Sequence, residues 1–131
     1  METLVIKEVK SDYCSPFVQL DPTSKIFEIS GESYLEDTDS FYQPIYQWLE
    51  EYSEKYTEPF TFNFKFTYFN SSSSKALLKL LKILKNYAEK NTSVKINWYY
   101  PEDNQDLLLE GEDFMNILDL PIQFVPIQVD Y

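Results

Sequence analysis

Residues Pro59 to Lys85 read PFTFNFKFTYFNSSSSKALLKLLKILK, and this segment contains the two clearest patterns in the chain. From Phe60 to Tyr68, aromatic residues alternate with Thr, Asn and Lys, which predicts a strand with one buried aromatic face and one polar face. From the serines to about Lys90, leucines recur three and four residues apart, which predicts an amphipathic helix. The segment therefore predicts a half-buried sheet with a helix packed against it.

Two further strands precede this segment. Residues Phe17 to Leu20 and Lys25 to Ser30 flank the turn sequence DPTS and predict a hairpin that ends at Gly31. An earlier run, Leu4 to Val9, also favours a strand.

A first helix is expected from Phe41 to Tyr56, where apolar residues again recur at helical spacing. Asp37, Thr38 or Asp39 is expected to cap it, and Pro44 is tolerable if it falls in the first turn.

The remaining chain predicts a strand at Val94 to Tyr100, an acidic loop that opens at Pro101, a third helix centred on Phe114 to Leu118 and a last strand at Ile122 to Val129. This order of elements predicts an α/β fold at the boundary with α+β. We expect one domain over residues 1–131, with a single mixed sheet, an N-terminal hairpin and about three helices mainly on one face.

The net charge of −11 argues against nucleic acid and anionic membrane surfaces as partners and favours a basic protein surface. No apolar run is long enough for a signal peptide or for insertion into a membrane. The single cysteine, Cys14, excludes an internal disulfide, so a cytoplasmic location is expected.

Missing residue types argue against catalysis. The chain has no histidine and only two glycines, so it can hold neither a histidine-dependent triad or metal site nor a glycine-rich nucleotide loop. We expect no enzyme activity, cofactor, metal or small-molecule substrate. A hydrolase that uses the carboxylates of Glu32, Glu36 or Asp37 is a weaker alternative.

Asn70 and the serines Ser71 to Ser74 lie where the central strand ends and a helix begins. One such residue would be enough to cap the helix. The helix dipole and free amides would also stabilise a phosphate on one of these serines, and the added charge could abolish a partner contact. Both interpretations remain open on these residues alone. The lysines of the helix, Lys75, Lys79, Lys82 and Lys85, indicate either a solvated face or a basic docking strip.

The chain resembles the SiaC family of bacterial regulatory phosphoproteins from about Gly31 to Val125. The resemblance rests on GESYLED (31–37), FYQPIYQWLEEY (41–52), TYFNSSSSKALLKLLKIL (67–84) and VKINWYYPEDN (94–104). It implies a STAS-like fold, similar to anti-sigma factor antagonists, and a partner-switching function.

In that family the acceptor directly follows the asparagine, which implies that Ser71 is phosphorylated here, with Ser72 as a second candidate. The resemblance also implies a protein kinase and a PP2C-type phosphatase that act on this site. The unmodified form would bind and stimulate a diguanylate cyclase, with cyclic di-GMP output and biofilm regulation downstream. The expected partner-binding residues are Glu32, Ser33, Tyr34, Asn70, Ser71, Ser72, Ser73 and Lys75.

The alternative function is a constitutive acidic protein that binds or inhibits a basic partner, with the serines acting only as a helix cap. The two hypotheses differ in whether a phosphate, or a charge that imitates it, changes binding.

Overall fold

The structure is a computed structural model, and it describes residues 1–90 and 93–128. Its elements, in chain order, are β1 (Leu4–Ile6), β2 (Val9–Lys10), β3 (Cys14–Ser15), β4 (Phe17–Asp21), β5 (Ile26–Ser33), α1 (Thr38–Lys55), β6 (Phe60–Phe69), α2 (Ser71–Glu89), β7 (Val94–Pro101), α3 (Gln105–Leu118) and β8 (Gln123–Ile127).

The main sheet has the strand order β1-β4-β5-β6-β7-β8. The predicted hairpin is confirmed, since β4 and β5 pair antiparallel from Phe17↔Ser30 to Asp21↔Ile26. The strands from β5 to β8 all pair in parallel. The final residue of the expected last strand, Val129, lies outside the described residues.

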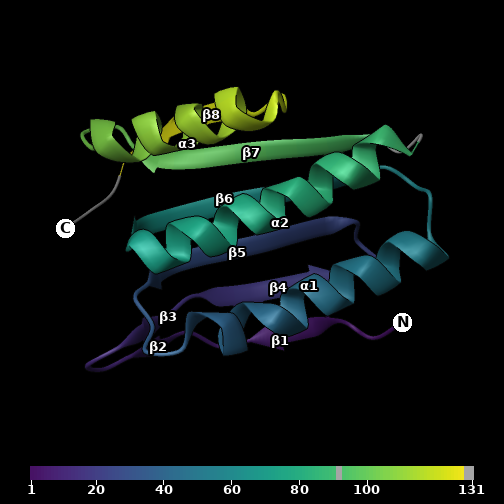
Figure 1. The fold of residues 1–131 in the computed structure, drawn as a ribbon, viewed down its shortest axis with the longest axis horizontal. Coiled ribbons are helices and arrows are strands. Elements are labelled where there is room, and N and C mark those ends of the chain that lie inside the picture. Colours follow the sequence, from purple (N-terminus) through teal and green to yellow (C-terminus); the bar gives the residue numbers. More distant parts are fainter. Residues whose placement is uncertain (91–92, 129–131) are drawn as a thin grey trace.

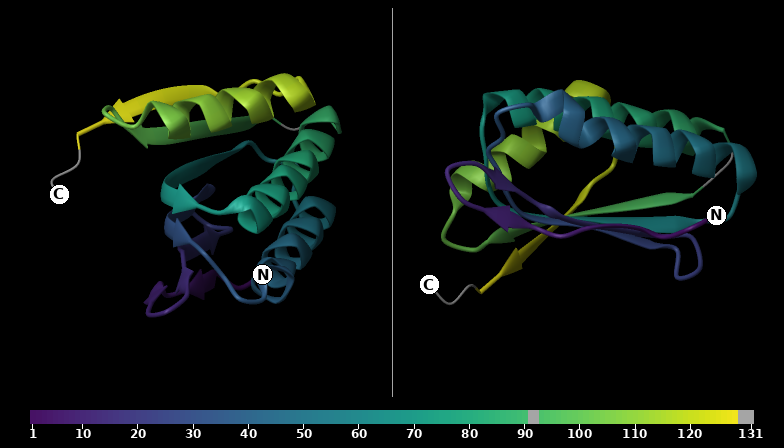
Figure 2. Two further views of the ribbon diagram at one scale, coloured as in Figure 1. Left: turned by 60° about the vertical axis from the view of Figure 1, so that its left-hand side comes forward. Right: turned by 90° about the horizontal axis from the view of Figure 1, so that it is seen from below.

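All three helices lie on one side of the sheet (Figures 1 and 2). Each parallel crossover moves one strand further in the same direction across the sheet. Because such crossovers are right-handed, successive helices must pack on the same face. The expected α/β architecture is therefore confirmed. Within the described residues, no helix is both long and apolar enough to cross a membrane.

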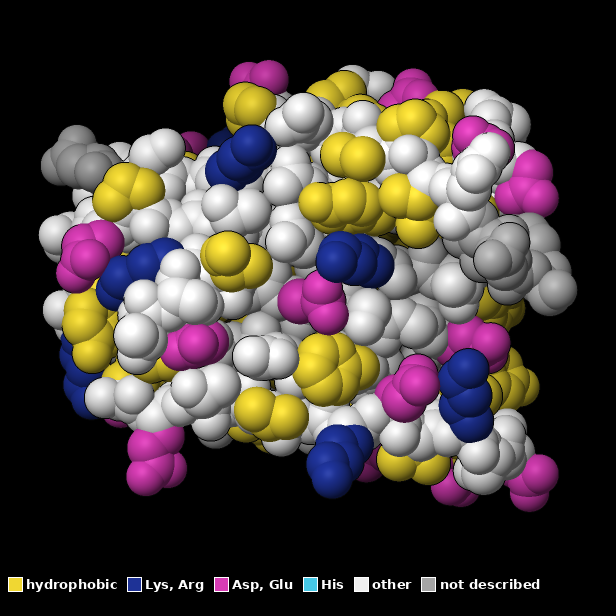
Figure 3. Space-filling model, turned by 180° about the vertical axis from the view of Figure 1, so that it is seen from behind, with side chains coloured by type: hydrophobic (Ala, Val, Ile, Leu, Met, Phe, Trp, Pro, Cys, Tyr) yellow, Lys and Arg dark blue, Asp and Glu magenta, His cyan; other side chains and the backbone are white. Residues whose placement is uncertain are grey.

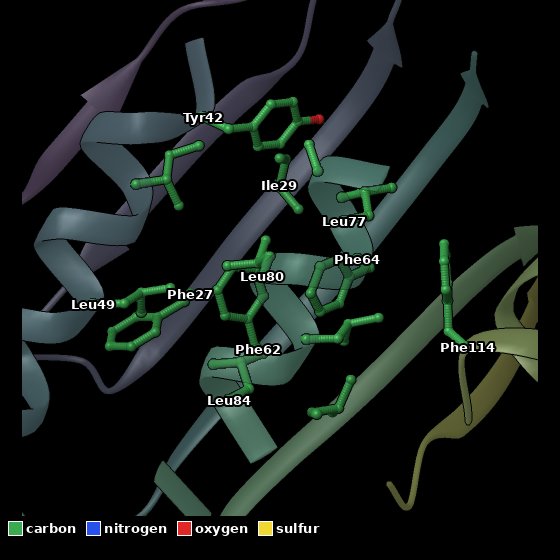
Figure 4. Close-up of a cluster of buried hydrophobic side chains, with 14 of the residues drawn as sticks. Phe27, Ile29, Tyr42, Leu49, Phe62, Phe64, Leu77, Leu80, Leu84 and Phe114 are labelled. Atoms are coloured by element: carbon green, nitrogen blue, oxygen red, sulfur yellow. The ribbon is translucent and has the colours of Figure 1, made fainter. Parts of the chain in front are cut away.

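The core lies between the helices and the aromatic face of the sheet (Figure 4). Phe62 and Phe64 are fully buried, and Leu77 and Leu80 of α2 are buried with them. Phe27 meets Trp48 and Tyr52 edge-on, with ring centroids 5.2 Å apart in each pair. Burial of each large side chain stabilises the fold by roughly 1.5–3 kcal/mol. The alternation from Phe60 to Phe66 thus produces the core layer that was expected.

One expectation for the central strand is wrong: Tyr68 does not belong to the buried aromatic face. Gly31 pairs with Phe66 but Glu32 pairs with Tyr68, so Thr67 is an extra residue in β6. A bulge of this kind turns the following side chains over. Tyr68 is consequently 51% exposed, while Phe69 is buried.

Gly31 does not end its strand, because β5 continues to Ser33. The residue has φ +103°, a left-handed conformation that glycine adopts without strain, and it lies next to the register shift. The glycine therefore lets the strand bend and continue.

Pro44 lies beyond the first turn of its helix, which contradicts the expected position. The helix begins at Thr38, with Asp37 as its N-cap. Because proline has no N–H, the carbonyl of Ser40 receives no hydrogen bond from residue 44.

The third helix is also longer than expected. It begins at Gln105, with Asn104 as its N-cap, so acidic residues assigned to a loop, such as Glu110, lie on α3.

Candidate functional site

The serine cluster begins α2, and Asn70 is the N-cap of that helix. Asn70 Oδ1 accepts hydrogen bonds from the amide of Ser73 at 3.0 Å and from Ser72 Oγ at 3.2 Å. Asn70 is extended at the end of β6, and this conformation allows its side chain to reach back to the free amides of the first turn. The capping role expected for Asn70 is present in the structure.

A chain of buried hydroxyls lies beneath the cluster. Ser33 Oγ is 2.8 Å from the hydroxyl of Tyr42 and 2.7 Å from Ser73 Oγ. Ser73 Oγ also donates to the carbonyl oxygen of Ser33 at 2.9 Å. Since each hydroxyl has one hydrogen, Tyr42 must donate to Ser33 and Ser33 must donate to Ser73. Burial raises the pKa of Tyr42, so its hydroxyl keeps this hydrogen.

Ser33 and Ser73 are both completely buried. Their expected contact with a partner is therefore wrong for their side chains, which lie inside the protein. The carbonyl of Ser33 also accepts from the amide of Asn70 at 3.2 Å. These contacts fix the start of α2 to the end of β5.

Ser71 and Ser72 are both exposed but face different grooves. Ser72 Oγ is 2.8 Å from Thr38 Oγ1, and it lines a groove of about 530 Å³ between the starts of α1 and α2, called groove A here. The lining of groove A is Glu36, Asp37, Thr38, Asp39, Tyr46, Ser72, Lys75, Ala76 and Lys79.

Ser71 lines a second groove, of about 460 Å³, called groove B. Its lining is Tyr68, Phe69, Asn70, Ser71, Ser74, Lys75 and Glu110. Lys75 lines both grooves, and Glu110 reaches groove B from α3. The pKa of Glu110 is raised, first by burial and then by the charges of Asp106 and Asp113.

Glu32 and Tyr34 lie at the end of β5. Tyr34 forms an isolated bridge with Cys14 through backbone hydrogen bonds of 2.7 and 2.8 Å, and its ring stacks on Tyr13 at 5.8 Å. Both tyrosines are partly exposed, at 44% and 43%. Tyr68 lies opposite Glu32 on the neighbouring strand, and it also lines groove B. Separate hydrophobic patches are visible on the sheet face that the helices leave open (Figure 3).

The sequence did not single out four residues as site residues: Tyr13, which stacks on Tyr34, Thr38 as a neighbour of Ser72, and Tyr68 and Glu110 in the lining of groove B. Tyr13 and Tyr68 become candidates only through their exposure, which the fold creates. Glu110 follows Asp106 by four residues and precedes Asp113 by three, a spacing that brings like charges together on a helix, but this signal can be used only after the extent of α3 is known.

The lysines of α2 do not form one free strip. Lys79 lies over the ring of Tyr46, 4.8 Å from its centroid. Lys85 donates to the carbonyl oxygen of Leu118 at the end of α3, at 2.6 Å. At least these two lysines therefore have contacts within the fold.

The carboxylates named for the hydrolase alternative do not form one cluster. Glu36 and Asp37 line groove A, whereas Glu32 lies on β5. Asp37 accepts from both the hydroxyl and the amide of Ser40, and these contacts hold the pKa of its carboxyl below its usual value. Asp37 is thus occupied as a helix cap.

The fold has already been seen in solved structures. The crystal structure of apo-SiaC from Pseudomonas aeruginosa matches with a TM-score of 0.85 and 23% identity, over 95% of this chain and 99% of that chain. A chain in the crystal structure of the diguanylate cyclase SiaD in complex with its activator SiaC, from the same organism, matches with a TM-score of 0.83 and 20% identity, over 93% of this chain and 100% of that chain.

The family model described as SiaC family regulatory phosphoprotein matches residues 9–127. The chain therefore belongs to the SiaC family of regulatory phosphoproteins. Comparison with curated protein sequences gives no match.

Proposed function

We propose that this protein is a cytoplasmic binding module that is switched by phosphorylation of Ser71 and acts through a partner, without catalysis of its own. The unmodified form binds and activates a diguanylate cyclase. A protein kinase adds the phosphate and a PP2C-type phosphatase removes it. Family membership supports the regulatory part of this proposal, and the SiaD–SiaC complex supports a cyclase as the partner.

The observation that carries the assignment of Ser71 is the difference between the two exposed serines. Ser72 Oγ is engaged by Thr38 and Asn70, whereas Ser71 Oγ makes no hydrogen bond within the described part of the chain. A phosphate on Ser72 would face groove A, where the three carboxylates of Glu36, Asp37 and Asp39 outnumber the two lysines of the lining. A phosphate on Ser71 would face groove B, where Lys75 and Glu110 are the charged residues of the lining. Electrostatics therefore favours Ser71 as the acceptor.

The surface that we propose for effector binding surrounds Ser71. Tyr68 and Lys75 line the same groove as Ser71, and Glu32 lies opposite Tyr68. Tyr34, with Tyr13 stacked on it, extends the surface beyond β5. Exposed tyrosines are frequent anchors of protein interfaces. A phosphate at Ser71 would add about −1.5 to −2 charges at its centre and so oppose docking.

The test combines mass spectrometry with binding. Fragment spectra of the protein purified from its native cells, with and without phosphatase treatment, should place one phosphate on Ser71. The Ser71→Ala variant should lose this phosphate, and Ser72→Ala should keep it.

Binding is then measured with the cyclase encoded in the same genome. Ser71→Asp should weaken binding and activation at least tenfold relative to Ser71→Ala, which corresponds to about 1.4 kcal/mol. Ser72→Asp is the matched control, because it adds the same charge on the side of groove A.

Equal binding by all of these variants, combined with a steep loss of binding in salt, would contradict the switch. It would instead support a constitutive acidic binder, consistent with the net charge of −11.

A further inference from the structure

Lys75 occupies a position between two surfaces that carry different charges. It lines groove A with Glu36, Asp37 and Asp39, and it lines groove B with Ser71 and Glu110. Lys75 is exposed, and no ion pair within the described residues holds its ammonium group in either groove. Its flexible side chain can therefore be drawn to whichever groove is more negative.

The spacing along α2 brings Lys75 to Ser71. The two residues are four apart on one helix, so their Cβ atoms are roughly 5–6 Å apart. An anion placed four residues before a lysine is also the more favourable orientation of such a pair, because both charges then agree with the helix dipole. A phosphate on Ser71 thus meets Lys75 without rearrangement of the backbone.

The α3 side of groove B contributes negative charge. Glu110 approaches from α3 and already lies near two other carboxylates, Asp106 and Asp113. These carboxylates cannot stabilise the negative charge of a phosphate added in groove B. Of the residues that line groove B, Lys75 is the cationic one.

We propose that Lys75 is the counter-ion of a phosphate on Ser71 and that phosphorylation withdraws it from groove A. In groove B, the ammonium group of Lys75 then neutralises part of the phosphate charge. Groove A keeps its three carboxylates and retains Lys79 as its remaining lysine. A single modification would in this way change the charge of two surfaces, the second of which the phosphate does not touch.

This inference rests on Ser71 as the modified residue, and its test does not need the kinase or the effector. Phosphoserine is installed at position 71 during synthesis of the full chain, and the second pKa of the phosphate is measured by phosphorus NMR titration. This pKa is ordinarily about 6. Because a nearby cation stabilises the dianion, the Lys75→Gln variant should raise it by about 0.3.

Lys79→Gln is the matched control, because it removes the same charge from the same helix and lines groove A alone. It should leave the phosphate pKa within about 0.1, and Lys75→Arg should restore the original value. The signal of the Lys75 ε-methylene group should titrate together with the phosphate, and that of Lys79 should not.

An equal phosphate pKa in the Lys75→Gln and Lys79→Gln proteins would overturn the proposal. That result would leave the proposed function standing, since Ser71 could still block a partner directly. Conversely, failure to find phosphate on Ser71 in cells would contradict the proposed function and leave this measurement unchanged.

Discussion

Ser73 Oγ lies 2.7 Å from Ser33 Oγ, and this contact joins the first turn of α2 to the end of β5. Both residues are fully buried, so their hydroxyls can bond only to each other and to the neighbouring Tyr42 hydroxyl and Ser33 carbonyl. The exposed serines Ser71 and Ser72 lie in the same first turn of α2 as Ser73. Their position relative to β5 is therefore set by the interior of the protein.

Replacement of Ser33 by alanine should lower the free energy of unfolding by about 1–3 kcal/mol, because it removes the acceptor of the buried Tyr42 hydroxyl and leaves Ser73 Oγ with only its bond to the carbonyl of residue 33. Urea denaturation measures this loss. Ser74→Ala is the control and should change stability by less than about 0.5 kcal/mol, since the Ser74 hydroxyl makes no hydrogen bond within the described residues. Equal effects of the two variants would show that the hydroxyl chain contributes nothing specific.

Asn70→Ala should destabilise the protein by about 1 kcal/mol, because it removes the side-chain oxygen that accepts from the amide of Ser73. Hydrogen exchange at that amide should become faster in the same variant. Asn70→Asp retains an acceptor oxygen and should keep most of the stability. If aspartate were as harmful as alanine at this position, capping would not be the function of Asn70.

Gly111→Ala should destabilise the protein, although alanine is normally favoured over glycine in a helix by about 1 kcal/mol. A Cβ atom at this position would lie 2.7 Å from Trp98 Nε1 and 2.8 Å from Phe124 Cε1. Relief of this overlap must move α3 away from β7, with a net loss of about 1–3 kcal/mol. Thermal unfolding followed by tryptophan fluorescence measures it, with the exposed Asn116→Ala as control. A gain in stability would show that α3 can shift freely.

In the Asp37→Asn variant, the free energy of unfolding should fall less as the pH is lowered. Contacts with the hydroxyl and then the amide of Ser40 lower the pKa of Asp37 in the folded state. The native protein therefore binds fewer protons than the unfolded chain. The stability from Asp37 is present above the unfolded pKa of about 3.9, and it is lost as the pH falls through the lower folded pKa.

Asparagine can still cap the helix but does not titrate. Denaturation curves between pH 2 and pH 6 should therefore show a shallower dependence in Asp37→Asn than in the unaltered protein. Glu36→Gln, one residue earlier, is the control. A parallel pH dependence in the Asp37→Asn and unaltered proteins would contradict the role of this carboxylate.

Periodicity was enough to predict the layers of the fold. The alternation of Phe60 to Phe66 identifies the central strand, and the leucine spacing of α2 identifies the helix that covers it. These patterns are strong because each strand and helix buries one continuous face. The hairpin between β4 and β5 was equally clear from its turn residues.

The features that shape the candidate site depend on tertiary contacts. The extra residue at Thr67 follows from the register between β5 and β6, which a single strand's pattern does not specify. This one irregularity exposes Tyr68. Burial of Ser33 and Ser73 depends similarly on their pairing across 40 residues of sequence, and an isolated serine is usually read as exposed.

The parallel strands from β5 to β7 have a consequence for how such a protein can diverge. Their carboxyl ends share one edge of the sheet, where the loops that lead into α1, α2 and α3 lie (Figure 1). The turn at Asp21 to Lys25 belongs to the other edge, where the backbone of Thr61 bonds to Lys25. Substitutions at the first edge can alter the choice of partner while the second edge and the aromatic layer continue to specify the fold. Recognition and folding can therefore evolve in separate parts of the same short chain.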